Sequence, residues 1–277
     1  MICFPNAKIN LGLHIISKRP DGYHNIETVF YPVALRDALE IVPAHGEKGT
    51  FRQTGIPVDG HPEDNLVMKA LKLLSSTYKI PEIDICLLKK IPFGAGLGGG
   101  SSNAAFMLKL LNDYAQLGLT NNELEGLAGQ LGADCPFFIR NKAVFASGIG
   151  NIFENIEISL EDYRIVLVKP DVQVSTKAAY SMVRPAPAGC SLKRIAQSPV
   201  ETWKEHMVND FEQSVFRQYP SLRNIKEQLY GAGAVYASMS GSGSSLFGIF
   251  KGEIPRFPEE YFGAATIYPC ADLPASR

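Results

Sequence analysis

Short runs of alternating apolar and polar residues fill the first third of the chain. They cover residues 8–16, 27–34 and 38–42, and turn-forming segments such as Arg19-Pro20-Asp21-Gly22 separate them. A period of two is typical of strands that bury one face. The first third therefore predicts an antiparallel sheet, in which residues 35–37 form a turn between two strands.

Apolar residues spaced three or four positions apart predict helices in the middle of the chain. One helix covers residues 65–78, and a second begins near Ser102 and ends at Gly118. The residues from Thr120 to Glu123 match a capping box for a third helix, which closes at Gly132. These apolar stripes are interpreted as core.

The second half of the chain mixes strands and helices in a different order. We expect strands over 164–169, 234–239 and 246–250 and helices over 176–183, 200–216 and 221–230. Because strands do not alternate strictly with single helices, this order favours an α+β fold over a doubly wound one. The change of pattern predicts two domains, residues 1–155 and 156–277.

A glycine-rich turn over residues 92–102 joins a half-exposed strand (83–91) to the second helix. Its residues are Pro92, Phe93, Gly94, Ala95, Gly96, Leu97, Gly98, Gly99, Gly100, Ser101 and Ser102. Glycines allow successive backbone N–H groups to converge on one anion, and the helix that follows adds the positive end of its dipole. The turn therefore predicts a phosphate site. A tight strand-to-helix connection is the alternative interpretation.

Two familiar phosphate motifs fit this turn poorly. A P-loop needs a lysine and then Ser or Thr after its last glycine, but Ser101 and Ser102 follow Gly100 directly. The spacing of Gly94, Gly96 and Gly99 matches a dinucleotide-binding motif. However, the helix that follows leads to another helix and not to a second buried strand with an acidic end. An NAD-dependent dehydrogenase is therefore disfavoured.

Composition narrows the class of protein further. With 277 residues, 45% of them hydrophobic, the chain can bury a substantial core, and a net charge of −1 offers no basic excess for nucleic acid or an anionic membrane. The five cysteines form no C-x-x-C pair and the histidines have no ligand spacing, so we expect neither disulfides nor a dedicated metal site. Without a signal-peptide pattern or a membrane-spanning apolar run, a cytoplasmic protein is expected.

Five segments together resemble the GHMP kinase superfamily over most of the chain. They are residues 5–13 (PNAKINLGL), 21–24 (DGYH), the glycine-rich turn, 132–136 (GADCP) and 238–243 (SMSGSG). The resemblance implies an N-terminal domain like domain 2 of ribosomal protein S5 and a C-terminal ferredoxin-like domain. It also implies a kinase that transfers the γ-phosphoryl group of ATP, with Mg²⁺ arriving on the ATP.

The same resemblance implies the acceptor and the residues at the chemistry. The acceptor is the 2-hydroxyl of a cytidylated methylerythritol, so the partner is a small cytidine diphosphate conjugate; the oligomeric state is not indicated. Asp134 is implied as the base for the hydroxyl proton, and Lys8 lies beside it and stabilises negative charge. From the residues alone, Asp134 is more typical of a helix start and Lys8 of a solvated strand lysine.

The resemblance also assigns binding roles. The glycine-rich turn holds the ATP phosphates, and Ser101 and Ser102 add hydroxyl bonds to phosphate or to water bound to the metal. Tyr23, His24 and Tyr180 bind the cytidine end, because an aromatic ring stacks on cytosine while an imidazole reads its edge. Asn10 is a hydrogen-bonding residue on the substrate side. Taken alone, His24, Tyr180 and Asn10 also suit a loop, core or strand-end position.

Two further segments carry weaker indications. Residues 240–245, here called the third-motif loop, resemble the third superfamily motif that shapes the wall near the acceptor, and they equally suit a flexible turn. Asn151 stands where many members carry an acidic residue, a difference that should leave the core chemistry unchanged.

Two alternative functions stay open. One is another GHMP kinase, of the homoserine, mevalonate or galactose type, whose substrates carry no cytosine for residues 21–24 and Tyr180. The other is a nonenzymatic nucleotide-binding or RNA-binding module, against which the joint presence of Lys8 and Asp134 and the neutral charge argue.

Overall fold

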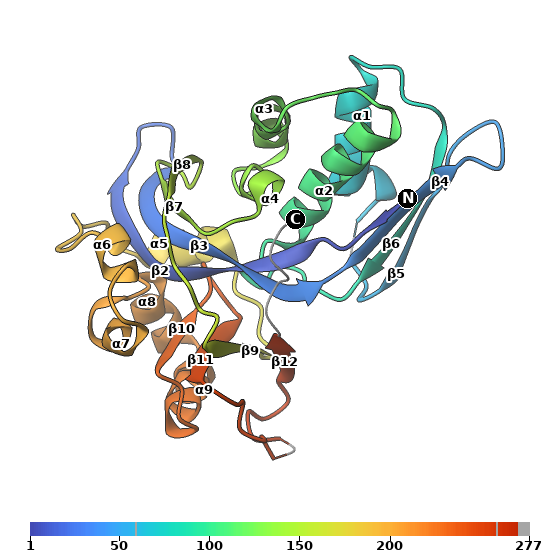
Figure 1. Cartoon of the computed structure of the whole chain (residues 1–277). Helices are drawn as coiled ribbons and strands as arrows, with labels where there is room; N and C mark the ends of the chain where they lie inside the picture. Colours follow the sequence, from blue (N-terminus) through green and yellow to red (C-terminus); the bar gives the residue numbers. More distant parts are fainter. Residues whose placement is uncertain (59, 259, 271–277) are drawn as a thin grey trace. The chain divides into compact units, whose positions relative to one another are not determined.

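The chain forms two compact units made of interleaved segments. The computed structural model, drawn in Figure 1, describes residues 1–58, 60–258 and 260–270. Among these, unit 1 holds residues 1–7, 35–93 and 98–142, and unit 2 holds residues 8–34, 94–97 and 143–270.

Unit 1 is built on a mixed sheet. Its strands, in spatial order, are β1 (Ile2–Cys3), β4 (Ala38–Pro43), β6 (Ile83–Lys89) and β5 (Phe51–Gly55). β4 is antiparallel to β1 and to β6, whereas β5 runs parallel to β6. The half-exposed character predicted for β6 is confirmed, since Ile83, Ile85 and Leu87 are buried while Leu88 is exposed.

Helices cover one face of this sheet. The helical segments of unit 1 are η1 (Pro62–Asp64), α1 (Leu66–Ser75), α2 (Gly99–Tyr114), α3 (Asn121–Leu131) and α4 (Phe137–Arg140). α1 packs against α2, and both lie over the sheet in Figure 1. The capping box predicted at Thr120 and Glu123 is confirmed. The predicted start of α2 near Ser102 is wrong. The helix begins at Gly99 and includes both Gly99 and Gly100, despite the low helix propensity of glycine.

Within the described residues, unit 2 contains two further sheets. One has the order β2 (Asn6–Lys18), β3 (His24–Arg36), β7 (Val144–Ser147) and β8 (Ile152–Asn155), and its first two strands continue into unit 1. The other has the order β10 (Tyr236–Met239), β11 (Leu246–Lys251), β9 (Tyr163–Lys169) and β12 (Thr266–Cys270). Separate sheets with mainly antiparallel pairing confirm the predicted α+β class.

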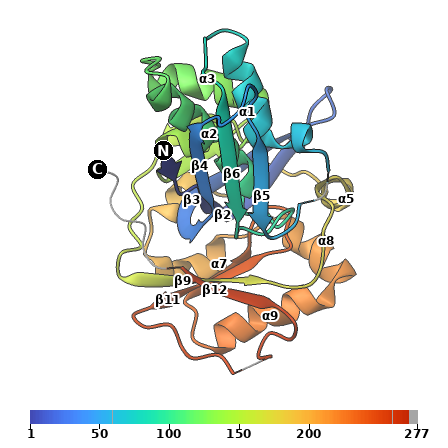
Figure 2. The ribbon, with the colours of Figure 1, turned by 90° about the vertical axis from the view of Figure 1, so that its right-hand side faces the viewer.

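The helical segments described in unit 2 are α5 (Thr176–Met182), α6 (Leu192–Ala196), η2 (Val200–Thr202), α7 (Trp203–His206), α8 (Phe211–Gln218) and α9 (Pro220–Gly231). Of these, α5, α8 and α9 contribute residues to a large apolar cluster. α9 packs on β10 and β11, as Figure 2 shows. Buried Leu13, Val166, Val215 and Leu229 belong to the cluster.

The single helix predicted over residues 200–216 is wrong. The chain leaves the helical conformation between α7 and α8, where Leu13 of β2 bonds the backbone on both sides of Asn209. Leu13 N donates to Val208 O over 2.9 Å, and Asp210 N donates to Leu13 O over 2.9 Å. These bonds replace intrahelical ones, so a long-range pairing overrides a locally helical pattern.

No helix in the described residues is both long enough and apolar enough to cross a bilayer.

Candidate active site

The glycine-rich turn has a backbone suited to anions. Gly94, Gly96 and Gly98 have φ angles of +62°, +76° and +68°, so every second residue is left-handed. Left-handed residues at such spacing allow successive N–H groups to face one side, as they do in anion-binding nests. The conformation therefore supports the predicted phosphate role, which stays a prediction.

Residues 94–97 of the turn belong to unit 2 and are held there by three bonds. Lys8 N donates to Leu97 O over 3.0 Å, and Ser245 N donates to Ala95 O over 3.2 Å. The Ser240 hydroxyl donates to Gly96 O over 2.8 Å. The turn is thus fixed on its carbonyl side, which leaves its amide groups available for a ligand.

Residues 98–102 belong to unit 1 and start α2. Ser102 N donates to Gly98 O over 2.8 Å, which closes the first helical turn. The Ser102 side chain is fully buried, and its hydroxyl has no hydrogen-bond partner among the described residues. A buried unpaired hydroxyl costs stability unless something bonds it. Ser102 therefore fits the predicted ligand role better than a purely structural one.

A pocket of about 340 Å³ lies beside the start of α2, entirely within unit 1. Its lining includes three polar side chains that could hydrogen-bond a heterocycle, from Asn65, Lys89 and Asn103. Gly100 and Phe93 of the glycine-rich turn also line it. The sequence patterns did not indicate this pocket, because its residues come from several separate segments of unit 1.

Asp37 organises the polar side of this pocket. Its side chain is fully buried, pairs with the Lys89 ammonium and accepts a 2.8 Å bond from Asn103 Nδ2. Lys89 also donates to Asn103 Oδ1 over 2.9 Å. The backbone N–H groups of Lys90 and Ile91 complete the shell of the carboxylate at 2.6 and 2.8 Å. One buried carboxylate thus fixes two pocket residues and the chain entering the glycine-rich turn.

Burial shifts the pKa of one charged group in this cluster. Desolvation lowers the pKa of Lys89 below its ordinary value, and the neighbouring Asp37 partly opposes that shift. The break predicted over residues 35–37 is confined to Asp37, since β3 extends to Arg36 and β4 begins at Ala38, and Asp37 is a buried hub. No local pattern could have identified the hub, since its side-chain partners lie 52 and 66 residues away.

In unit 2, Lys8 is held rigidly at the start of β2. Its side chain is 4% exposed, its ammonium donates to Asn10 Oδ1 over 2.7 Å, and it lies 4.8 Å from the centroid of the Phe30 ring. Asn10 Nδ2 donates in turn to Thr28 Oγ1 over 2.9 Å. The structure therefore brings the predicted residues Lys8 and Asn10 together, and the solvated-lysine alternative is wrong.

Asp134 lies in unit 1, in the turn between α3 and α4, and is half-buried. It does not cap α4, whose preceding residue is Pro136 with no side-chain cap bond. Burial raises the pKa of the adjacent Cys135 to about 11, so this thiol is protonated at neutral pH. The placement of Lys8 beside Asp134 stays a prediction of the resemblance.

The predicted cytidine-binding residues form an aromatic surface in unit 2. The rings of His24 and Tyr180 are stacked with centroids 4.9 Å apart, and Phe211 meets Tyr180 edge-on at 4.8 Å. Tyr23, which directly precedes His24 in the sequence, is 62% exposed. Burial, helped by the charge of Lys18, lowers the pKa of His24, so its imidazole is neutral at neutral pH and can both donate and accept.

Two further features concern Asn151 and the distribution of metal-binding side chains. Asn151 Oδ1 accepts a 3.3 Å bond from Ile149 N, so it stabilises its own turn. Within the described ranges, no three His, Cys, Asp or Glu side chains gather so as to hold a metal ion.

Comparisons with known proteins agree with this geometry. Residues 65–142 match the model of the GHMP kinases N terminal domain, and residues 192–260 match that of the GHMP kinases C terminal domain. A 4-diphosphocytidyl-2-C-methyl-D-erythritol kinase of Parabacteroides distasonis is 63% identical, over 91% of this chain and 92% of the relative. A kinase of the same name from Bacteroides fragilis is 58% identical, over 91% and 93%.

Solved structures give the same result. A crystal structure of 4-(cytidine 5'-diphospho)-2C-methyl-D-erythritol kinase is 29% identical, with a TM-score of 0.81 over 98% of this chain and 100% of the other. The mevalonate kinase of Methanococcus jannaschii, at 14% identity and a TM-score of 0.72 over 99% and 98%, shares the fold. Through these relatives and both domain models, the chain belongs to the GHMP kinases and, among them, to the 4-diphosphocytidyl-2-C-methyl-D-erythritol kinase family.

Proposed function

We propose that this protein transfers the γ-phosphoryl group of ATP to the 2-hydroxyl of 4-diphosphocytidyl-2-C-methyl-D-erythritol. The stacked pair of His24 and Tyr180 carries the choice of substrate. Homoserine, mevalonate and galactose contain no aromatic base, so they would leave such a surface unused. A cytosine ring can stack on it, while the neutral imidazole of His24 bonds the polar edge of the base.

ATP binds through residues of the glycine-rich turn and of the unit 1 pocket. The adenine occupies the pocket lined by Asn65, Lys89 and Asn103, and the phosphates lie on the amide groups of the turn. The orphaned hydroxyl of Ser102 bonds a phosphate oxygen or a water of the nucleotide complex. Mg²⁺ arriving with ATP would supply positive charge to the phosphate oxygens.

Phosphoryl transfer needs alignment and charge stabilisation more than covalent chemistry from the protein. Asp134 accepts the proton of the 2-hydroxyl as the new O–P bond forms. Lys8 supplies a fixed positive charge for the phosphoryl oxygens, because Asn10 and Phe30 hold its ammonium in a desolvated position. A nonenzymatic module would gain nothing from immobilising a lysine in this way.

The direct test is phosphorus NMR of the purified protein with ATP, Mg²⁺ and the cytidylated acceptor. The wild-type protein should give ADP and a new phosphate monoester, and Asp134→Asn should slow this by about 10²–10⁴-fold. Asp162→Asn, at an exposed position before β9, is the matched control and should match the wild type. No product from the wild-type protein contradicts the substrate, and equal product from Asp134→Asn removes Asp134 from the mechanism.

The five cysteines are all free in the structure, which supports the expected reducing, cytoplasmic compartment.

A further inference from the structure

The third-motif loop, residues 240–245, connects three functional segments within unit 2. The Ser240 hydroxyl accepts a 3.3 Å bond from Asn10 N and donates to Gly96 O over 2.8 Å. At the other side of the loop, the hydroxyls of Ser242 and Thr176 lie 3.1 Å apart, and Thr176 is the first residue of α5. The loop therefore shares contacts with the Lys8 strand, the glycine-rich turn and the helix that carries Tyr180.

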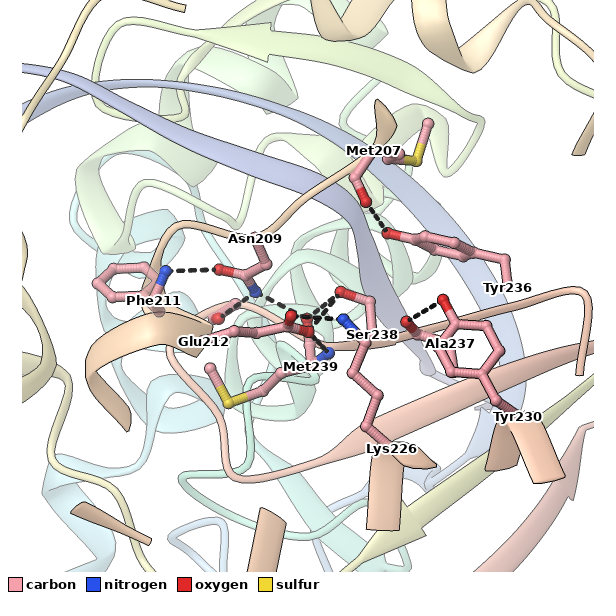
Figure 3. A network of polar contacts seen from close by, with 11 residues as sticks. Met207, Asn209, Phe211, Glu212, Lys226, Tyr230, Tyr236, Ala237, Ser238 and Met239 are labelled. Carbon is pink, nitrogen blue, oxygen red and sulfur yellow. Dashed lines mark hydrogen bonds and ion pairs between the residues drawn. The ribbon is translucent and has the colours of Figure 1, made fainter. Parts of the chain in front are cut away.

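Asn209 is the side chain that holds this loop in place. Its amide nitrogen donates to Met239 O over 2.7 Å and to Gly241 O over 2.9 Å, so it spans the entrance of the loop. Figure 3 shows the amide between Met239 and Phe211, whose N–H donates to Asn209 Oδ1 over 3.0 Å. Asn209 is 2% exposed, so these bonds do not compete with bulk water.

The backbone around Asn209 is itself tied to β2. Val208 O and Asp210 N bond Leu13, three residues along the strand from Asn10. One residue thus fixes the third-motif loop relative to the strand that carries Lys8 and Asn10.

Glu212 strengthens the same network from a different side. Its Oε1 accepts from Met239 N over 2.8 Å and from Ser238 Oγ over 3.0 Å, and its Oε2 pairs with Lys226 at 2.5 Å (Figure 3). These bonds end at β10, before the loop begins. Of Asn209 and Glu212, only Asn209 bonds a loop residue beyond Met239, namely Gly241.

We propose that Asn209 is a positioning residue for phosphoryl transfer, an inference that rests on the proposed function. By fixing the third-motif loop, its amide sets the position of the Gly96 carbonyl and of Asn10, and through Asn10 that of the Lys8 ammonium. Transfer is sensitive to such placement, since an error of about 1 Å can cost about 10²-fold in rate. The proposed adenine pocket is lined by unit 1 residues, and none of those described bonds Asn209, so we expect Asn209 to affect the alignment of the reacting groups more than nucleotide affinity.

Asn209→Asp separates the two roles of this side chain. Aspartate still accepts from Phe211 N and so keeps the bond at the start of α8, but an ionised carboxylate cannot donate to Met239 O or Gly241 O. The matched control is Asn112→Asp. The Asn112 amide also makes two bonds to the backbone of one residue: its Nδ2 donates to Leu119 O over 3.2 Å, and its Oδ1 accepts from Leu119 N over 2.9 Å. That site lies at the far end of α2.

We expect Asn209→Asp to lower kcat about 10- to 100-fold while each KM changes by less than about threefold. Asn112→Asp should lower Tm but keep the wild-type kcat. Asn209→Ser, which leaves a small uncharged side chain, serves if the aspartate variant does not fold, and should also lose kcat with KM unchanged.

The remaining outcomes overturn the inference. It is wrong if a folded Asn209 variant keeps the wild-type kcat, if its loss equals that of Asn112→Asp, or if neither Asn209 variant folds, because the role is then structural. An inactive wild-type protein overturns the proposed function and this inference together. An active wild-type protein with normal Asn209 variants overturns the inference alone.

Discussion

The two buried lysines of this protein are stabilised by different partners. Lys89 faces the carboxylate of Asp37, whereas the partners of Lys8 include an amide oxygen and an aromatic ring. A full charge pair makes Lys89 a structural cation whose loss of partner is costly. The amide and the ring hold the Lys8 ammonium in a defined position, which suits a cation that acts on phosphoryl oxygens.

Removing the carboxylate of Asp37 should destabilise the protein strongly. Asp37→Ala leaves the Lys89 ammonium buried without a counter-charge, and we expect the free energy of unfolding to fall by about 3–5 kcal/mol in urea denaturation. Asp21→Ala breaks the solvent-exposed pair with Arg19 and is the matched control, with no measurable change expected.

A double variant checks the cause of that loss. Replacing the buried pair by Asp37→Leu with Lys89→Met should cost less than the sum of the two single variants, because no charge then stays uncompensated. Additive losses would mean that packing, and not the charge pair, dominates at this site.

Single residues were predictable from sequence only where a local pattern includes them. Lys8 and Asn10 are two apart in a strand, so a period of two puts both on one face, and in the structure they are hydrogen-bonded. An isolated Asp134 or Lys8 carries no such pattern and was indicated by resemblance. Asp37 and Asn209 were missed, since every side-chain bond of Asp37 and the loop bonds of Asn209 join distant segments.

At the scale of elements, the glycine-rich turn depends on one close approach. A Cβ atom at Gly96 would lie 2.0 Å from Ser240 O, whereas one at Gly94 would meet nothing within 4 Å. Both residues are left-handed, so alanine carries a similar conformational cost at either site, about 1–2 kcal/mol. Only Gly96→Ala must also push the turn away from the third-motif loop.

Gly96→Ala should therefore lower kcat/KM for ATP far more than Gly94→Ala. Steady-state kinetics of the two purified variants measures the difference, and assays run well below the Tm of each variant show that it does not arise from global unfolding. Equal losses in the two variants would mean that the contact with Ser240 does not position the turn.

Elements with a strong local signal were predicted well. The capping box fixed the start of α3, because both of its bonds lie within four residues. β5 was missed, since its sequence FRQTG has a single large apolar residue and therefore no alternation of apolar and polar residues. The break between α7 and α8 was missed because its cause, the pairing with Leu13, lies about 195 residues away.

At the scale of the whole molecule, the α+β class followed from the order of strands and helices. The two compact units are interleaved along the chain, a grouping that no local hydrophobic pattern encodes. The domain division at residue 155 stays a prediction. The candidate ligand groups are nevertheless distinct, with the polar pocket in unit 1 and the His24–Tyr180 surface in unit 2.

Two separate ligand surfaces should stabilise the molecule independently. A ligand that binds only the folded state at about 100 times its Kd raises the free energy of unfolding by about 2.7 kcal/mol. Cytidine diphosphate should raise Tm more than uridine diphosphate, because the two bases carry opposite hydrogen-bonding groups at position 4 of the ring. His24→Ala should remove this preference yet keep the shift caused by ADP, whose proposed adenine pocket lies in unit 1. Equal shifts for the two pyrimidine nucleotides, or loss of the ADP shift in His24→Ala, would contradict the assignment of the ring pair to cytosine.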